Sequence, residues 1–236
     1  MDITEKGSET RKNQPGAAAL FWGGMFFTVI VMLWPILMVI SEVQGTVEEQ
    51  LLQILQTPRL YMANFLVASL IAPALLFLML TFAFAVETRM RIPLFEQIGA
   101  VFLTVYTALV SIAYTSQYAY LPRLLAAGEM EQARLWLFGS NVSLPYYLNQ
   151  LGYACFAVAA LLIGFKLLFE TGIPRVIGAL LWASALLSLL AFGGLALQLE
   201  AQGIASVMSG LLTLPVGILS IFWGKKLLRD IITTKQ

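Results

Sequence analysis

The sequence predicts an all-α membrane protein: a bundle of six transmembrane helices with two short amphipathic helices on the outer face. Its 236 residues are 59% hydrophobic and only 11% charged, far from the composition of ordinary soluble domains. Six stretches lack charge and reach the roughly 20 residues that a helix needs to cross a bilayer. They are apolar on every side, whereas barrel strands alternate. These stretches are residues 17–40, 61–86, 98–121, 146–165, 176–199 and 204–224.

The basic residues predict which side of the membrane each connection faces. With six spans both termini lie on one side, and that side carries most of the Lys and Arg, whereas only Arg59, Arg123 and Arg134 lie opposite. Basic residues concentrate in cytoplasmic segments. We therefore expect a bacterial inner membrane protein with cytoplasmic termini, built as a polar tail over residues 1–16 and one transmembrane domain over 17–232. The basic residues on the terminal side are Lys6, Arg11, Lys12, Arg89, Arg91, Lys166, Arg175, Lys225, Lys226, Arg229 and Lys235.

The two outer-face connections, residues 41–60 and 122–145, are long enough to hold structure of their own. In the first, Thr46 followed three places later by Glu49 fits a capping box, and Thr57 with Pro58 ends the predicted helix. In the second, "GEMEQARLWLFGSN" predicts a short helix from near Glu129 to Gly139. We expect both helices to lie flat over the bundle.

Polar side chains gather on one face of the third span. With roughly 100° between successive residues of a helix, Tyr114 and Tyr118 share a face with several hydroxyl residues, while Gln117 and Tyr120 point elsewhere. The fourth span repeats this arrangement, because Asn149, Gln150 and Tyr153 share one face with the small residues below them, Ala157, Ala160 and Gly164. Such small residues allow two helices to approach closely.

Two interpretations of these polar faces remain open. The first is a ligand-binding cluster in the outer leaflet, with Arg123 adding a positive rim. The second is ordinary interhelical packing, in which the polar groups hydrogen-bond to one another or to water and Arg123 only anchors the surface. The predicted ligand-binding residues are Tyr114, Tyr118, Asn149, Gln150, Tyr153 and Arg123.

Missing residue types argue against catalysis. The chain contains no histidine, which is the usual residue of haem, copper and zinc sites and of general bases. The apolar centres of the spans contain no charged residue, so the proton relays of coupled transporters are missing. Acids occur at the span margins, at Glu42, Glu87, Glu96, Glu170 and Glu200. Glu87 with Arg89, and Glu170 with Arg175, are interpreted as interfacial charges. Cys155, the single cysteine, is read as a packing residue. We expect no cofactor and no metal.

Two stretches carry a resemblance. They are "LLQILQTPRLYMANFLVASLIAPALLFLMLTFAF", in which a short helix leads directly into the second span, and "TGIPRVIG", the turn into the fifth span. With these the chain resembles a broad group of uncharacterised bacterial six-helix membrane proteins catalogued as domains of unknown function. The similarity covers about residues 15 to 200. It implies the six-helix fold and no activity.

The sequence therefore leads to three functional hypotheses. The first is a non-catalytic protein that binds a lipid or small amphipathic ligand between the third and fourth spans. The second is an accessory subunit of a larger membrane complex, with a membrane-protein partner or a second copy of the chain. The third is an uncoupled transporter or channel. Membrane lipids are the expected partners in every case, and nucleic acid is not.

Overall fold

The structure, a computed structural model, describes residues 3–86, 88–199 and 202–233, with side chains from Pro15 onward. The predicted fold class is confirmed, because the described residues form helices and contain no strand, and six of the helices are long and apolar enough to cross a membrane. Two of the acids noted at span margins, Glu87 and Glu200, lie outside the described residues.

The six spanning helices occupy the predicted stretches and mostly extend beyond them. The first helix begins at Ile3, so the stretch expected as a tail continues the first span. The third span, α4, begins five residues before the predicted start, and the fourth, α7, ends three residues after the predicted end. The spans are α1 (Ile3–Ile40), α3 (Pro58–Leu80) continued by the π-helix η1 (Thr81–Ala85), α4 (Pro93–Ala119), α7 (Leu144–Leu168), α8 (Ile173–Ala196) and α9 (Gln202–Thr233).

Proline sets the start of four of these spans. Pro58, Pro93, Pro145 and Pro174 stand in the first turns of α3, α4, α7 and α8. A proline is well suited to this place, because its missing N–H would have no partner within the helix and its fixed φ is already helical. The prolines therefore mark where each new span begins after a connection.

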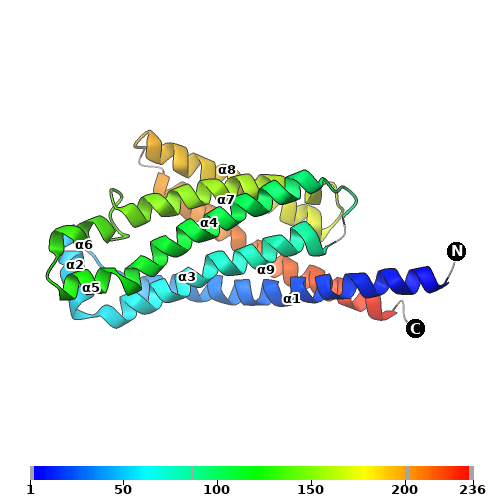
Figure 1. Cartoon of the computed structure of the whole chain (residues 1–236), viewed down its shortest axis with the longest axis horizontal. Helices are drawn as coiled ribbons and strands as arrows, with labels where there is room; N and C mark the ends of the chain where they lie inside the picture. The colour runs from blue at the N-terminus through cyan, green and yellow to red at the C-terminus, as the bar shows by residue number, and fades with distance from the viewer. Residues whose placement is uncertain (1–2, 87, 200–201, 234–236) are drawn as a thin grey trace.

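The spans close into a ring. Each packs against the next along the chain, and α1 packs against α9. Figure 1 shows an elongated bundle with both chain ends at one end, which we call the terminal end. The short helices α2, α5 and α6 lie at the opposite, capped end. Large side chains fill the bundle, among them Phe27, Phe82, Tyr106 and Phe156, which are fully buried.

The small residues predicted to permit close approach do so. Ala157 and Ala160 of α7 are fully buried. Gly164 lies against Gly178 of α8, where a Cβ atom on Gly178 would come within 3.0 Å of the Gly164 carbonyl oxygen. The α7–α8 pair is therefore packed backbone to backbone, as is typical of membrane helices with small residues at their interface.

The capped end contains three short helices, α2 (Val47–Gln56), α5 (Leu121–Ala126) and α6 (Met130–Trp136). The capping box is confirmed, because Thr46 Oγ1 accepts from the Glu49 N–H at 3.3 Å and Glu49 Oε2 accepts from the Thr46 N–H at 2.7 Å. The hydrogen bond from the Thr46 backbone also lowers the pKa of the Glu49 carboxyl. The helix α6 ends at Trp136, before the predicted Gly139, and α5 was not expected.

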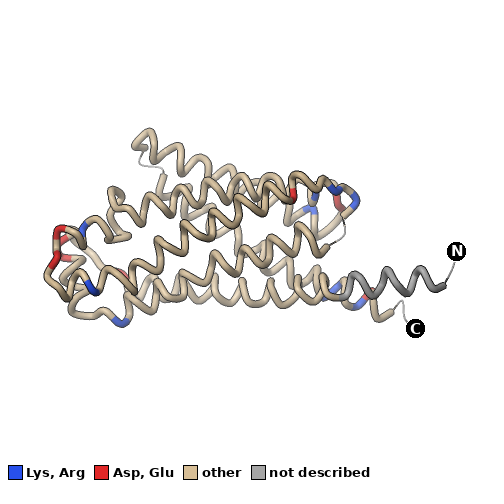
Figure 2. Tube along the Cα trace, in the orientation of Figure 1, with Lys and Arg blue, Asp and Glu red and all other residues tan. Residues whose placement is uncertain are grey.

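Charges lie where the spans end. Figure 2 shows the charged residues of the described chain gathered toward the two ends of the bundle, with the middle left to uncharged side chains. At the capped end Arg134 of α6 pairs with Glu48 of α2 at 2.5 Å, which joins two of the short helices. The long uncharged middle matches the hydrocarbon core of a bilayer.

Candidate functional site

The predicted polar residues lie near the capped end, at different depths. Tyr114, Asn149 and Gln150 are buried, and Tyr118 and Tyr153 are partly buried. The helices α4 and α7 are packed neighbours, and they bring Tyr114 together with Tyr153, whereas Gln150 reaches α9. Arg123 differs, because it lies on the short helix α5 and is exposed.

The tyrosines are joined through Tyr153. Its hydroxyl group interacts with those of Tyr106 and Tyr114, and its ring lies edge-on to that of Tyr106 with the centroids 5.7 Å apart. Tyr106 was not among the predicted residues, because it stands outside the polar face of the third span in a helical projection. Tyr106 is fully buried and belongs to the same aromatic cluster through its ring contact with Tyr153.

Two amide oxygens of α7 are buried without a partner. They are Oδ1 of Asn149 and Oε1 of Gln150. The amide nitrogen of Gln150 donates to Ser206 Oγ of α9 at 3.3 Å, and one turn before Ser206 the Oε1 atom of Gln202 is likewise buried without a partner. A buried acceptor without a donor costs about 1–3 kcal/mol. The cluster therefore presents hydrogen-bond acceptors that the described protein groups leave open.

The buried serines between α8 and α9 are satisfied. Ser184 and Ser188 of α8 meet Ser209 of α9 through hydroxyl contacts of 3.0 and 2.6 Å, and Ser184 Oγ donates to the Ser209 carbonyl at 2.9 Å. These serines form ordinary hydrogen bonds between the two helices. The open acceptors of Asn149 and Gln150 thus contrast with a satisfied polar contact between neighbouring helices.

Gln117 points away from the cluster, as the helical projection predicts, but it is fully buried and holds a contact that the sequence did not reveal. Its Oε1 accepts from the Tyr61 hydroxyl at 2.7 Å and from the Phe138 N–H at 3.0 Å, and its Nε2 donates to the Trp136 carbonyl at 2.8 Å. The segment after α6 folds over this face of α4, so Gln117 ties α3 and α4 to the cap.

We expect Gln117→Leu to loosen the cap. The substitution leaves the Tyr61 hydroxyl and the Phe138 N–H without their acceptor, at a cost of about 1–3 kcal/mol for each buried group that stays unpaired. Limited proteolysis around residues 136–139, together with thermal unfolding in detergent, measures the effect. Gln132→Leu on the exposed face of α6 is the control, and equal behaviour of the two variants contradicts the assignment.

A cleft opens between the start of α7 and the end of α8. Its volume is about 630 Å³. The lining is mainly apolar, with Trp136, Leu144, Phe192 and Leu195 among its residues and Asn141 and Ser143 as polar members. The six predicted site residues do not line this cleft. Ser143, Leu144 and Tyr147 of its lining precede Asn149 and Gln150 within the first two turns of α7.

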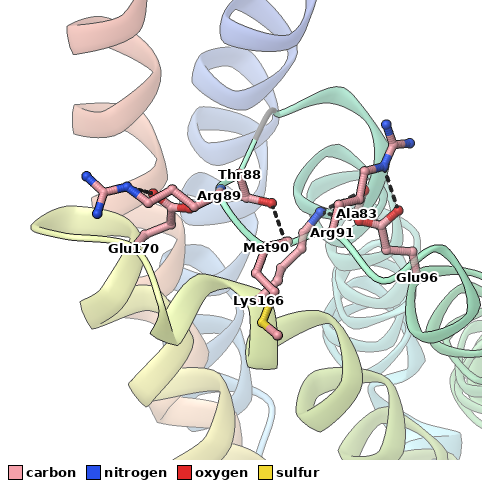
Figure 3. Close-up of polar contacts among 8 residues, drawn as sticks. All are labelled: Ala83, Thr88, Arg89, Met90, Arg91, Glu96, Lys166 and Glu170. Carbon is pink, nitrogen blue, oxygen red and sulfur yellow. Dashed lines mark hydrogen bonds and ion pairs between the residues drawn. The ribbon is translucent and has the colours of Figure 1, made fainter.

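The terminal end contains a buried ion pair (Figure 3). Lys166 Nζ of α7 lies 2.8 Å from Glu96 Oε1 of α4 and donates to the Ala83 carbonyl of η1 at 2.8 Å. Arg91 contacts the other Glu96 oxygen at 3.3 Å. The exposed fractions of the Lys166 and Glu96 side chains are 4% and 2%. Glu96, which the sequence placed at the margin of the third span, is therefore buried, because α4 begins at Pro93.

A second ion pair ties two connections together beside the first. Arg89, in the connection before α4, pairs with Glu170, which follows α7, at 3.9 Å, as Figure 3 shows. The Arg89 side chain is 70% exposed, so this pair contributes little to stability. Glu170 was predicted to be an interfacial charge beside Arg175, and the structure shows its contact with Arg89. Both pairs lie at the terminal end, far from the polar cluster, and the buried one joins η1, α4 and α7.

Comparison of the chain with models of protein families, with curated proteins and with solved structures finds no match in any of the three. The class of protein therefore follows from the fold. Six helices long and apolar enough to cross a membrane define a multi-pass membrane protein.

Proposed function

We propose that this chain is a non-catalytic membrane protein that binds a lipid or a small amphipathic molecule at the capped end, between α4 and α7. The observation that supports this proposal best is the pair of buried amide oxygens on Asn149 and Gln150 that have no partner. A ligand head group with hydroxyl, amide or ammonium donors would satisfy them. Tyr114, Tyr118 and Tyr153 would surround that head group.

The neighbouring cleft suits the apolar part of such a molecule. At about 630 Å³, it falls in the volume range of ordinary ligand sites, roughly 300–1,000 Å³. Its lining includes Leu144, Phe192 and Leu195, which suits a hydrocarbon chain. We propose that the chain of the ligand lies in the cleft while its head group turns toward α7.

The proposed location is the bacterial inner membrane, with the capped end outside and the terminal end in the cytoplasm. The distribution of basic residues supports this orientation. The connections and helix ends at the terminal end carry Arg89, Arg91, Arg175, Lys225, Lys226 and Arg229, whereas the capped end carries Arg59, Arg123 and Arg134. The ligand would then come from the outer leaflet.

The double variant Asn149→Leu/Gln150→Leu tests the proposal. We expect native mass spectrometry of the gently extracted wild type to show a lipid-sized adduct, and the double variant to lose at least about 90% of it, since hydrogen bonds worth 1.4 kcal/mol in total already change the affinity tenfold. Folding is expected to survive, because the change removes two acceptors that lack donors. Gln132→Leu, which replaces an exposed amide, is the control and should keep the adduct.

The other outcomes of this experiment contradict the proposal. Equal adducts on the wild type and the double variant mean that the amides only pack the helices. A stoichiometric protein partner without a small-molecule adduct makes the chain an accessory subunit. Passage of small solutes across liposomes that contain the purified protein, without a retained adduct, favours the transporter or channel hypothesis.

A further inference from the structure

A second cavity lies under the cap, and Tyr61, the partner of Gln117, is among its lining residues. Its volume is about 340 Å³. It is enclosed by the end of α1, by α2, by the start of α3 and by the segment after α6. Its polar lining residues are Ser41, Glu42, Gln50, Tyr61 and Asn64, and Met38, Phe65 and Phe138 are among its apolar ones.

Asn64 is the buried polar group of this cavity. Only 6% of its surface is exposed, and its Oδ1 atom is buried with no hydrogen-bond partner. The residue stands in the second turn of α3 and lines the cavity. An acceptor that deep in a cavity calls for a donor from a molecule inside it.

The neighbouring side chains use their donors elsewhere. The Tyr61 hydroxyl donates to Gln117, and Gln50 Nε2 donates to the Gly45 carbonyl at 2.9 Å. Gln50 Oε1 is left as an acceptor. It faces Gly139, where an added Cβ atom would lie 2.9 Å from it. The Glu42 carboxylate is exposed at the rim and offers only acceptors. The lining is therefore rich in acceptors.

The carboxyl end of α1 adds partial negative charge to this lining of acceptors. The helix ends at Ile40 with no basic residue in its last turn, so the partial negative charge of its carboxyl end is not balanced from within the helix. Ser41 and Glu42 follow immediately and line the cavity. A cation placed there meets the helix end, a carboxylate and a buried amide oxygen.

We propose that this cavity is a binding site for the primary ammonium group of an amphipathic amine. An ammonium group carries three donors and no acceptor, which matches a site made of Asn64 Oδ1, Gln50 Oε1 and the Glu42 carboxylate. The apolar lining by Met38 and Phe65 receives the first carbons of the molecule. The site is separate from the amide cluster of α7, and it does not depend on the function proposed above.

The test compares two lipids that differ in their donors. Phosphatidylethanolamine carries the primary ammonium, and phosphatidylcholine with the same acyl chains carries a trimethylammonium group, which has the same charge but no N–H donor. The protein is titrated with each lipid, and the bound lipid is measured by native mass spectrometry. We expect the ethanolamine lipid to be retained about tenfold better, because a charged hydrogen bond of about 1.4 kcal/mol corresponds to a tenfold change in affinity. Glu42→Gln and Asn64→Leu should each remove most of this preference.

Matched controls separate this site from other effects. Glu131→Gln removes an exposed carboxylate of α6 that lies outside the cavity and should leave the preference unchanged. Asn149→Leu/Gln150→Leu should also leave it unchanged, so failure of the ammonium site and failure of the cluster between α4 and α7 are distinguishable. Glu42 is exposed, so Glu42→Gln tests the site even if Asn64→Leu fails to fold.

Each outcome decides the proposal. If free ethanolamine displaces the bound ethanolamine lipid, the site is supported and its ligand is a soluble amine. If the tenfold preference is present and free ethanolamine does not displace the lipid, the ligand is a lipid head group. Equal retention of both lipids by the wild type overturns the proposal. So does a preference that survives Glu42→Gln and Asn64→Leu.

Discussion

Lys166→Met is expected to remove most of the folded protein from detergent extracts. The substitution leaves the Glu96 carboxylate, only 2% exposed, with Arg91 alone at 3.3 Å, and it leaves the Ala83 carbonyl without its donor. Breaking a buried ion pair from one side costs about 3–5 kcal/mol, a large part of the 5–15 kcal/mol that a typical protein has in total. Size-exclusion chromatography and thermal unfolding in detergent measure the loss.

A double variant separates charge from packing. Glu96→Leu/Lys166→Met removes both charges, and we expect it to recover most of the lost protein, because apolar replacement of a buried pair is often neutral or stabilising. Lys225→Met removes an exposed lysine of α9 and should behave as the wild type. If Lys166→Met is as stable as Lys225→Met, the pair does not hold the terminal end together.

Gly224→Ala is expected to open the seam between α1 and α9. A Cβ atom at Gly224 would lie 2.6 Å from the Phe21 backbone nitrogen and 3.0 Å from the Ala17 carbonyl oxygen. Both atoms belong to the backbone of α1, so relief requires a shift of the whole helix. Overpacking of this kind costs about 1–3 kcal/mol. We therefore expect a lower unfolding temperature and faster proteolysis at the ends of α1 and α9.

The same helix provides the matched control. A Cβ atom at Gly203 meets nothing within 4 Å, and alanine favours a helix over glycine by about 1 kcal/mol. Gly203→Ala should thus keep or raise the unfolding temperature. Equal unfolding temperatures for Gly224→Ala and Gly203→Ala mean that α1 and α9 do not pack as closely as the structure shows.

Local patterns in the sequence predicted most of the fold. The spans follow from uncharged stretches, and the cap of α2 follows from Thr46 and Glu49, three residues apart. The close contact of Gly164 with α8 was predictable from the small residues on one face of α7. In each case the signal and its consequence lie within one helix, where helical periodicity relates sequence to space.

Contacts between distant residues were not predictable in the same way. Lys166 and Glu96 stand 70 positions apart, each at the edge of a span, so hydropathy alone could not show that they pair. In projection Gln117 stood alone on its face of α4. Its burial was not predictable, because nothing in the sequence shows that residues 136–138 fold over it. For the predicted cluster, the projection correctly brought Tyr114 near Tyr153, but Arg123 lies on an unpredicted helix.

The contact between α1 and α9 also bears on how the protein is made. Among the six spans, α1 leaves the ribosome before α9, so the face of α1 that contains Gly24 and Phe27 has no partner from α9 until the other four spans have been made. Every other neighbouring pair of spans emerges in succession and can associate at once. The ring of six spans can therefore close only after α9 has been made.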